Sequence, residues 1–383
     1  MPDIIVIGGG ITGLATACAL AGAGLSVSVL EARQLGAMAS TWTLGGVRQS
    51  GRDPAELPLA RAAVARWSQW HLELGAETGY RRKGNLRLAR NPAEVATIRA
   101  MVKTQRALGL NLELLADIKD IRAIAPAIGE GVLAASFCPD DGHADPDMTI
   151  AALAGLARRK GVTLQEGMPA LRLLTQAGRV IGVETPGGRL PADRVVVACG
   201  LHAAGLLEPL GIRLPMAAKR VCVMQTTPQP PAFEQVFGVA NADCAGRQEI
   251  DGRFRVTTGI GDWPGEPATW SEAGLRPSFA EIAGLIARTL PILPLLAASG
   301  LERVWGGLID LTPDALPVLD APADWPGLVI GAGFSGHGFG IGPVSGTILK
   351  ALALGEATEF DLSPFRLDRF EPQAAFAPLT LHG

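Results

Sequence analysis

A glycine-rich turn directly after the first apolar run constrains the fold of this chain more than any other feature. Residues 8–13 read Gly-Gly-Gly-Ile-Thr-Gly and follow the apolar run at residues 4–7. Gly8, Gly10 and Gly13 have the GxGxxG spacing of a dinucleotide-binding turn, which needs a tight turn, close approach of a pyrophosphate and close helix–sheet packing. The turn therefore predicts phosphates bound at a helix N-terminus.

The sequence around this turn has the other parts of a βαβ unit. A helix-compatible stretch runs from about residue 11 to residue 23, and Gly24 fits its end. Residues 25–30 are expected to form a second strand, and Glu31 closes it where an acidic residue would bind a ribose hydroxyl. The stretch before Glu31 is uncharged, but its glycines favour a buried strand and helix over a membrane span, which needs about 20 predominantly apolar residues.

Composition limits the class of protein and its partners. The chain has 383 residues, 48% of them apolar, which is enough for two cores and favours two domains. Its net charge of −3 gives no signal for binding nucleic acid. The five cysteines form no CxxC pair, and the five histidines form no HxH or HExxH pattern. We expect reduced thiols, no metal site, no transmembrane segment and a cytoplasmic location in a bacterium.

The chain divides into alternating segments of two kinds. Residues 1–80, 146–215 and 326–383 combine helices with buried strands and are expected to form a Rossmann-like nucleotide-binding domain. Residues 81–145 and 216–325 contain shorter, alternating strands and are expected to form a substrate-binding domain on a mixed or antiparallel sheet. The predicted fold class is therefore α/β, with an α+β substrate part.

Four motifs, which follow one another along the chain, resemble those of one enzyme family. The resemblance covers nearly the full length of this chain. They are the N-terminal turn with residues 31–33, the segment at residues 39–48, the buried strand and turn at residues 195–203, and the glycine-rich run at residues 331–340. Together they resemble the FAD-dependent D-amino-acid oxidase superfamily. Within it, the chain is similar to the branch that contains glycine oxidase, the sarcosine oxidase β subunit and dye-linked proline dehydrogenase.

The resemblance implies a bound FAD and a reaction at a carbon–nitrogen bond. It implies that a small amino acid or secondary amine is oxidised to an imine by hydride transfer to flavin N5. The residues expected to bind FAD are Gly8, Gly10, Ile11, Thr12, Gly13, Glu31, Ala32, Arg33, Ser40, Thr41, Gly45, Gly46, Val47, Ala170, Ala198, Gly200, Gly331, Gly333, Phe334, Ser335, Gly336, His337, Gly338, Phe339 and Gly340.

Two residues are expected to have catalytic roles beside the flavin. Arg48 follows two glycines, and a guanidinium there would favour anionic reduced flavin and hold a substrate carboxylate. Arg52 is a weaker candidate for the same role. His337 could hydrogen-bond the flavin, line the substrate cavity and handle protons, or could be a polar loop residue without such a role. The glycines around it predict a tight loop followed by a helix that starts near Pro343.

Departures from the family pattern narrow the prediction. Ile309 lies near the position of the carboxylate-binding arginine of glycine and D-amino-acid oxidases, which favours glycine or an N-methylated or cyclic secondary amino acid as substrate. In the similar monomeric sarcosine oxidases, FAD is attached through a cysteine just after the strand that matches residues 305–308. No cysteine follows Cys244 in this sequence, so the resemblance implies non-covalent FAD. No lysine occurs at residues 248–258. The similar monomeric sarcosine oxidases have an oxygen-activating lysine in this region, although some relatives react with oxygen without it. Its absence favours a dehydrogenase with another electron acceptor over an oxidase.

Two functional hypotheses stay open at this point. In the first, the chain is an enzyme by itself and passes electrons to oxygen or to a redox partner. In the second, it is a flavoprotein β-like subunit of a hetero-oligomeric amino-acid or opine dehydrogenase or oxidase. It would then need partner subunits, through which it could associate with a membrane. If Arg48 does not hold the carboxylate, the alternatives are Arg220, Arg253 and Arg255.

Overall fold

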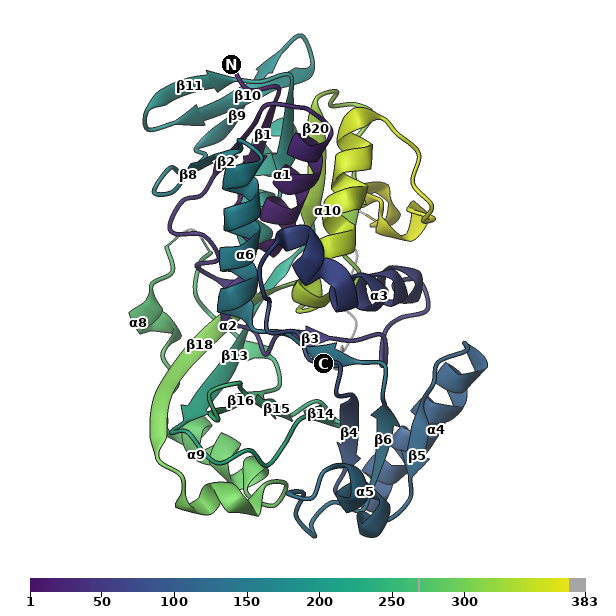
Figure 1. Ribbon diagram of the computed structural model, residues 1–383. Coiled ribbons are helices and arrows are strands. Elements are labelled where there is room, and N and C mark those ends of the chain that lie inside the picture. Colours follow the sequence, from purple (N-terminus) through teal and green to yellow (C-terminus); the bar gives the residue numbers. More distant parts are fainter. Residues whose placement is uncertain (268, 372–383) are drawn as a thin grey trace.

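Two large β-sheets carry the fold, one in each half of the molecule (Figure 1). The computed structural model describes residues 1–267 and 269–371. Residues 372–383, the end of the third expected nucleotide-binding segment, lie outside the described residues. The α/β class predicted from the sequence is confirmed.

The first sheet has six strands in the order β19-β20-β12-β1-β2-β8. Its strands run parallel except β19, which pairs antiparallel with β20 at the edge. The central strands β1 and β12 are rich in Val and Ile and are buried apart from the half-buried Arg194 at the start of β12, as expected for a parallel sheet covered on both faces. The bounds are β1 Ile4–Ile7, β2 Val27–Leu30, β8 Thr163–Gln165, β12 Arg194–Val197, β19 Val318–Asp320 and β20 Leu328–Ala332.

Helices cover one face of this sheet, and a small antiparallel sheet covers the other (Figure 1). The helices share one hydrophobic core with the parallel strands. Their bounds are α1 Ile11–Gly22, α3 Leu57–Leu74, α6 Pro146–Arg159 and α10 Gly338–Leu354. The small sheet consists of β9 Arg172–Gln176, β10 Arg179–Thr185 and β11 Gly188–Pro191.

The second large sheet has nine strands and is mixed, because β14 pairs parallel with β4 while its other pairs are antiparallel. One of its faces packs on a core that includes residues of helices α5 and α9. The strands are β4 Asn85–Ala89, β5 Glu113–Leu115, β6 Ala134–Cys138, β13 Ala217–Thr226, β14 Val236–Val239, β15 Cys244–Gln248, β16 Phe254–Thr258, β17 Gly261–Asp262 and β18 Leu301–Leu311. The remaining elements are α2 Ala39–Trp42, β3 Gly46–Val47, α4 Pro92–Ala107, α5 Ile118–Ile124, β7 Gly142–His143, α7 Ala203–Leu207, α8 Glu272–Leu275 and α9 Phe279–Thr289.

The strands of the two large sheets follow the expected segments with one exception. Strand β19 belongs to the six-stranded sheet, although the expected boundary at residue 325 groups it with the substrate-binding segments. It is held there because Val318 and Leu319 are fully buried in the two cores on either face of that sheet. None of the described helices is long and apolar enough to cross a membrane.

Helix α10 begins earlier than the sequence predicts. The expected start near Pro343 is wrong: the helix starts at Gly338, and Pro343 lies inside it. Because glycines are weak helix formers, the glycine-rich sequence around residue 340 predicts a loop. These glycines are needed because a Cβ at Gly342 would lie 2.9 Å from Ile11 of α1, and one at Gly346 would lie 2.7 Å from Ala15.

This close contact predicts that Gly346→Ala destabilises the protein. The added methyl group meets the backbone of α1, and overpacking of this kind costs about 1–3 kcal/mol in the free energy of unfolding. Gly155→Ala on α6 is the matched control, because its Cβ would meet only the flexible end of Arg159 at 3.4 Å. Urea denaturation should show a lower midpoint for Gly346→Ala and an unchanged or higher midpoint for Gly155→Ala. Equal midpoints for the two variants would contradict the close packing.

Candidate cofactor and substrate site

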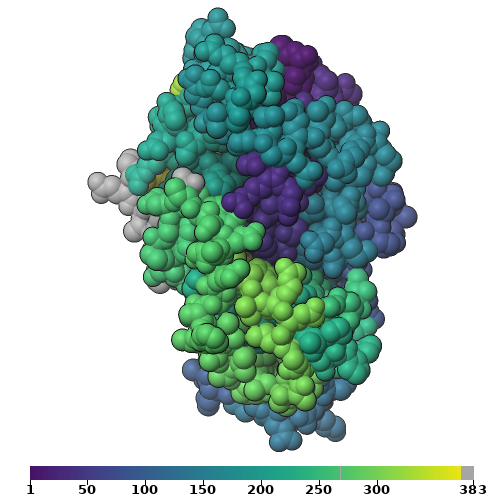
Figure 2. Space-filling view, turned by 90° about the vertical axis from the view of Figure 1, so that its left-hand side faces the viewer, coloured from purple at the N-terminus to yellow at the C-terminus, as the bar shows by residue number. Residues whose placement is uncertain are grey.

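A cavity of about 660 Å³ lies between the six-stranded and the nine-stranded sheet. Residues of β1 and β2 line it on one side, and residues of β13, β15 and β16 line it on the other. Figure 2 shows this boundary at the surface, where purple N-terminal residues lie between the teal and the green parts of the chain. The site is therefore built from segments that are far apart in the sequence.

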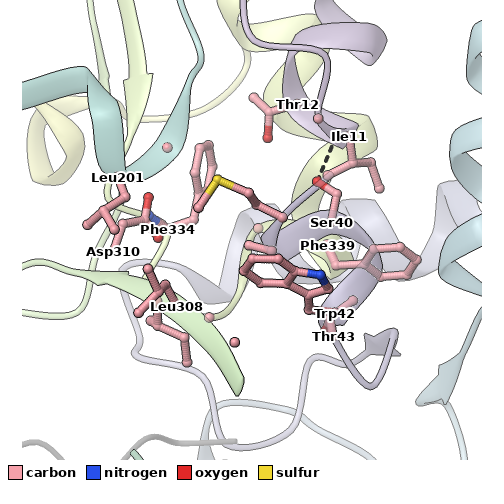
Figure 3. Close-up of a pocket in the computed structure, with 18 of the residues that line it drawn as sticks. Ile11, Thr12, Ser40, Trp42, Thr43, Leu201, Leu308, Asp310, Phe334 and Phe339 are labelled. Atoms are coloured by element: carbon pink, nitrogen blue, oxygen red, sulfur yellow. Dashed lines mark hydrogen bonds between the residues drawn. The ribbon is translucent and has the colours of Figure 1, made fainter. Parts of the chain in front are cut away.

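The glycine turn predicted from the sequence lies at the cavity. Gly8 has a φ of +109°, a conformation that favours glycine, and Gly10 lines the cavity next to Ser40. The hydroxyl of Ser40 accepts a hydrogen bond of 3.0 Å from the amide of Ile11 at the start of α1 (Figure 3). Gly13 does not line the cavity. Because it has no side chain, α1 can pack against the carbonyl of Gly8. Close helix packing is the role that the motif predicts for this third glycine.

Glu31 ends strand β2 at the cavity, as expected. Its carboxylate accepts hydrogen bonds of 2.8 Å from the amides of Gly9 and Arg33. These bonds fix the carboxylate beside the turn and leave each oxygen able to accept a further bond from a ribose hydroxyl.

The glycine-rich run after β20 forms another wall of the cavity. Asp310 fixes this run, because its Oδ2 accepts hydrogen bonds from the amides of Gly333, at 3.0 Å, and Phe334, at 3.3 Å. Figure 3 shows Asp310 and Phe334 together on one side of the cavity. Burial raises the pKa of Asp310 to about 6, which its hydrogen bonds to amides partly oppose.

The structure brings most of the predicted cofactor-binding residues together, and it places the rest behind them. Those that line the cavity are Gly8, Gly10, Ile11, Thr12, Glu31, Ala32, Arg33, Ser40, Gly46, Ala170, Ala198, Gly200, Phe334, Gly336, His337, Gly338 and Phe339. Those that do not line it are Gly13, Thr41, Gly45, Val47, Gly331, Gly333, Ser335 and Gly340. The second group packs against neighbouring elements: for example, a Cβ at Gly340 would lie 2.9 Å from the carbonyl of Gly46.

The predicted catalytic residues Arg48 and His337 both line the cavity, and so does Arg52. All three side chains are buried, and Nδ1 of His337 lies 3.0 Å from Oε2 of the buried Glu56. Burial lowers the pKa of Arg48 well below its ordinary value, and the positive charges of Arg52 and Arg87 act in the same direction. A negatively charged ligand would relieve this repulsion.

The alternative arginines of the second sheet do not line the cavity. Arg220 pairs with Glu281, and Arg253 forms partly exposed pairs with Asp251 and Glu302. The buried Arg255 has a different role: its Nε lies 2.7 Å from Glu249, and its Nη1 donates to the carbonyls of Thr41, at 3.2 Å, and Thr43, at 2.8 Å. Arg255 therefore ties the nine-stranded sheet to the segment that carries Ser40, Trp42 and Arg48.

Several residues of the site had no signal in the sequence strong enough to single them out. Trp42 projects into the cavity from α2 (Figure 3). Its ring meets that of Trp270 edge to face, with ring centroids 5.5 Å apart. Arg33 lies 3.8 Å above the ring of Trp270. Glu56 and Asp310 are single acidic residues that only the tertiary structure brings to the site. A clue for Trp42 is its position between the expected residues Thr41 and Gly45.

The cavity wall on the nine-stranded sheet is largely apolar. Neighbouring strands present their side chains to it, and Val223 of β13 pairs in register with Thr257 of β16. The lining side chains there include Val221, Val223, Val236, Phe237, Ala245, Thr257, Leu308 and Ile309, together with the acidic Asp310. Asn85 adds a polar group, and its Nδ2 donates to the hydroxyl of Ser50 at 3.2 Å. This wall fits a small ligand with an apolar body.

Comparison with known proteins agrees with this architecture. A family model described as FAD-dependent oxidoreductase (DAO) matches residues 3–352. The chain is 27% identical to the sarcosine oxidase β subunit of Arthrobacter sp., over 96% of this chain and 91% of that one. It is also 27% identical to 4-methylaminobutanoate oxidase (formaldehyde-forming) of Paenarthrobacter nicotinovorans, but it spans only 45% of that protein's length.

Solved structures share the whole fold. The glycine oxidase of Geobacillus kaustophilus superimposes with a TM-score of 0.89 at 25% identity, covering 97% of this chain and 99% of that one. The L-proline dehydrogenase of P. horikoshii superimposes with a TM-score of 0.86 at 27% identity, covering 96% and 97%. The resemblance inferred from the four motifs is thereby confirmed. The chain belongs to the DAO family of FAD-dependent oxidoreductases.

Proposed function

We propose that this chain oxidises the carbon–nitrogen bond of a small amino acid or secondary amine, such as glycine, sarcosine or proline, to an imine. The observation that carries the proposal is the pair of buried arginines, Arg48 and Arg52, in the wall of the cavity that also contains the dinucleotide turn. The named relatives and solved structures, which include glycine and sarcosine oxidases and a proline dehydrogenase, support the substrate class.

The residues of the cavity fit FAD. Glycine at position 10 leaves space that a Cβ, 2.9 Å from Ser40 Oγ, would begin to fill. The first amides of α1 lack partners within the helix and attract phosphate, while Glu31 is positioned for a ribose. At the other wall, α10 points its N-terminus toward the cavity through Gly338 and Phe339. When bound, FAD supplies the two-electron acceptor of the reaction, with hydride transfer to flavin N5.

The charges beside the cavity favour a carboxylate as ligand. Arg48, Arg52 and Arg87 are buried near two buried carboxylates, Glu56 and Asp141, so the cluster has an excess of positive charge. Nη1 of Arg52 makes no hydrogen bond with the described residues and lies 3.9 Å from Oε2 of Glu56 in an ion pair. A guanidinium can bind a carboxylate through two parallel hydrogen bonds, which would orient the amine carbon toward the flavin.

The apolar wall predicts which groups the substrate carries apart from its carboxylate. Because the wall of the nine-stranded sheet presents valine, alanine and threonine side chains, we expect an N-methyl group or an aliphatic ring there rather than a second charged group. Glycine, sarcosine and proline meet this requirement. The electron acceptor is proposed to be oxygen or a redox partner, with the chain active without further subunits in the cytoplasm.

Reduction of the flavin without oxygen tests the proposal directly. The purified protein should lose its visible flavin absorbance with at least one of glycine, sarcosine, L-proline, D-proline or an opine. It should lose it much more slowly with methylamine or pyrrolidine, which lack the carboxylate. Flavin that none of these amino acids reduces would contradict the proposal, as would equal rates for proline and pyrrolidine. Admitting air, or adding a dye, then identifies the acceptor class and shows whether the chain works alone.

We expect FAD to be bound without a covalent bond. The cysteines that line the cavity are Cys199 and Cys244, and burial raises their pKa values to about 12 and about 11, which keeps the thiols protonated and unreactive. Heat or acid precipitation of the yellow protein should leave FAD in the supernatant. Gly10→Leu should give colourless protein that is still folded by circular dichroism. Flavin that stays on the denatured chain, or a yellow Gly10→Leu variant, would contradict this assignment.

Arg48→Lys is expected to keep FAD but to lose the two-point contact with the carboxylate. The loss should be on the order of 2 to 4 kcal/mol in transition-state stabilisation, which is roughly 30- to 1000-fold in kcat/KM. Arg48→Ala should be worse and should weaken the binding of sulfite to the flavin. Arg253→Lys, on an exposed pair away from the cavity, serves as the control. Wild-type rates of flavin reduction in both Arg48 variants would show that this arginine does not act on the substrate.

A further inference from the structure

A buried acid–histidine pair lies at the cavity and has no part in the function proposed above. Glu56 is the residue before α3, and His337 is the residue before α10, so the starts of two helices bring them together. Nδ1 of His337 lies 3.0 Å from Oε2 of Glu56, and the side chains are 6% and 0% exposed. His337 lines the cavity, whereas Glu56 lies behind it.

The negative charge of Glu56 favours the proton on Nδ1, the imidazole nitrogen that lies 3.0 Å from its Oε2. Burial raises the pKa of Glu56, but the contact with His337 and the positive charges of Arg52 and Arg48 outweigh this effect and lower the pKa, so the carboxylate is ionised. An ionised carboxylate only accepts hydrogen bonds. The favoured neutral imidazole therefore has its proton on Nδ1 and a free electron pair on Nε2.

Neither nitrogen of the imidazole makes a hydrogen bond with the described residues, and Nδ1 has only its 3.0 Å ion-pair contact with Glu56. Nε2 of His337 is buried and makes no hydrogen bond with the part of the chain that the structure describes, although the residue lines the cavity. An unpaired buried acceptor costs about 1–3 kcal/mol, so its position at a ligand cavity calls for a ligand that donates to it. Amines and ammonium groups are such donors.

The surrounding charges keep this imidazole neutral. Burial lowers the pKa of His337, and Arg52 and Arg48, both in the segment after β3, lower it further. Glu56, at the start of α3, opposes them. A histidine whose pKa is lowered in this way is uncharged at neutral pH and can accept a proton.

We propose that Nε2 of His337 is the proton acceptor for the amine of the substrate, with Glu56 as the residue that positions it. This inference rests on the proposed function. An amino acid enters mainly as an ammonium ion, and its nitrogen needs an electron pair before hydride can leave the neighbouring carbon. The N–H bond breaks, its electron pair stays on nitrogen, and the proton moves to Nε2. The C–H hydrogen then leaves with its two electrons to FAD, and the carbon–nitrogen double bond forms from the nitrogen pair. Glu56 stabilises the imidazolium until the proton passes to water.

The tautomer can be tested without any substrate. NMR of the FAD-loaded protein, labelled on its histidine nitrogens, should show His337 at neutral pH with Nδ1 protonated and Nε2 unprotonated. The signal is assigned by its loss in His337→Gln. Glu56→Gln should shift the midpoint of the His337 titration to lower pH, because the anion that favours the imidazolium is gone. A proton on Nε2, or an imidazolium at neutral pH, would overturn the proposal.

The pH dependence of flavin reduction separates a proton acceptor from a structural residue. With the fastest amino acid of the panel, His337→Gln should reduce its flavin about 100-fold more slowly at neutral pH. As the pH rises toward the pKa of the amine, the ratio of the wild-type rate to the His337→Gln rate should fall about tenfold per pH unit. The reason is that substrate whose amine is already neutral needs no proton acceptor. His71→Gln, away from the cavity, should keep the wild-type profile. A deficit that is constant with pH would overturn the role, whereas a panel that reduces no flavin at all would overturn the proposed function itself.

Discussion

The close contact between α1 and α10 is the constraint on which the site depends. Gly342 and Gly346 have no side chain of their own, so Ile11 and Ala15 of α1 pack directly against α10, and Figure 1 shows the two helices side by side over the six-stranded sheet. Since α1 begins at Ile11 and α10 at Gly338, the contact brings two helix N-termini to one cavity. Each N-terminus has a partial positive charge, so the cavity favours a phosphate at α1 and negative charge at α10.

The second sheet completes the site by holding the segment after α2 against the first. Arg255 donates to the carbonyls of Thr41 and Thr43, and the buried carboxylate of Asp141 accepts from the amide of Gln49 at 2.8 Å. Burying so many charges is costly unless they are paired. Clusters of buried groups with shifted pKa values are typical of functional sites, and here they surround Arg48.

The parts of this architecture that the sequence predicts are the local ones. The turn at residues 8–13 and the acidic Glu31 are encoded within one βαβ unit, so their spacing is sufficient to find them. The start of α10 is not local, because its glycines are there to admit α1, more than 300 residues earlier in the chain. The same holds for Glu56, which becomes notable only through its contact with His337. Strand β19 joins the six-stranded sheet although it lies in a segment expected for the other sheet, because the pattern of its three residues does not distinguish the two sheets.

A crystal structure of the FAD-loaded protein with a non-oxidisable carboxylate would test the central claim most directly. A suitable ligand is the proline analogue in which oxygen replaces the amine nitrogen. The account predicts FAD extending from Gly10 to the start of α10, with the carboxylate bound by Arg48 and Arg52. A carboxylate bound away from both arginines, with FAD in place, would contradict the assignment of the substrate site.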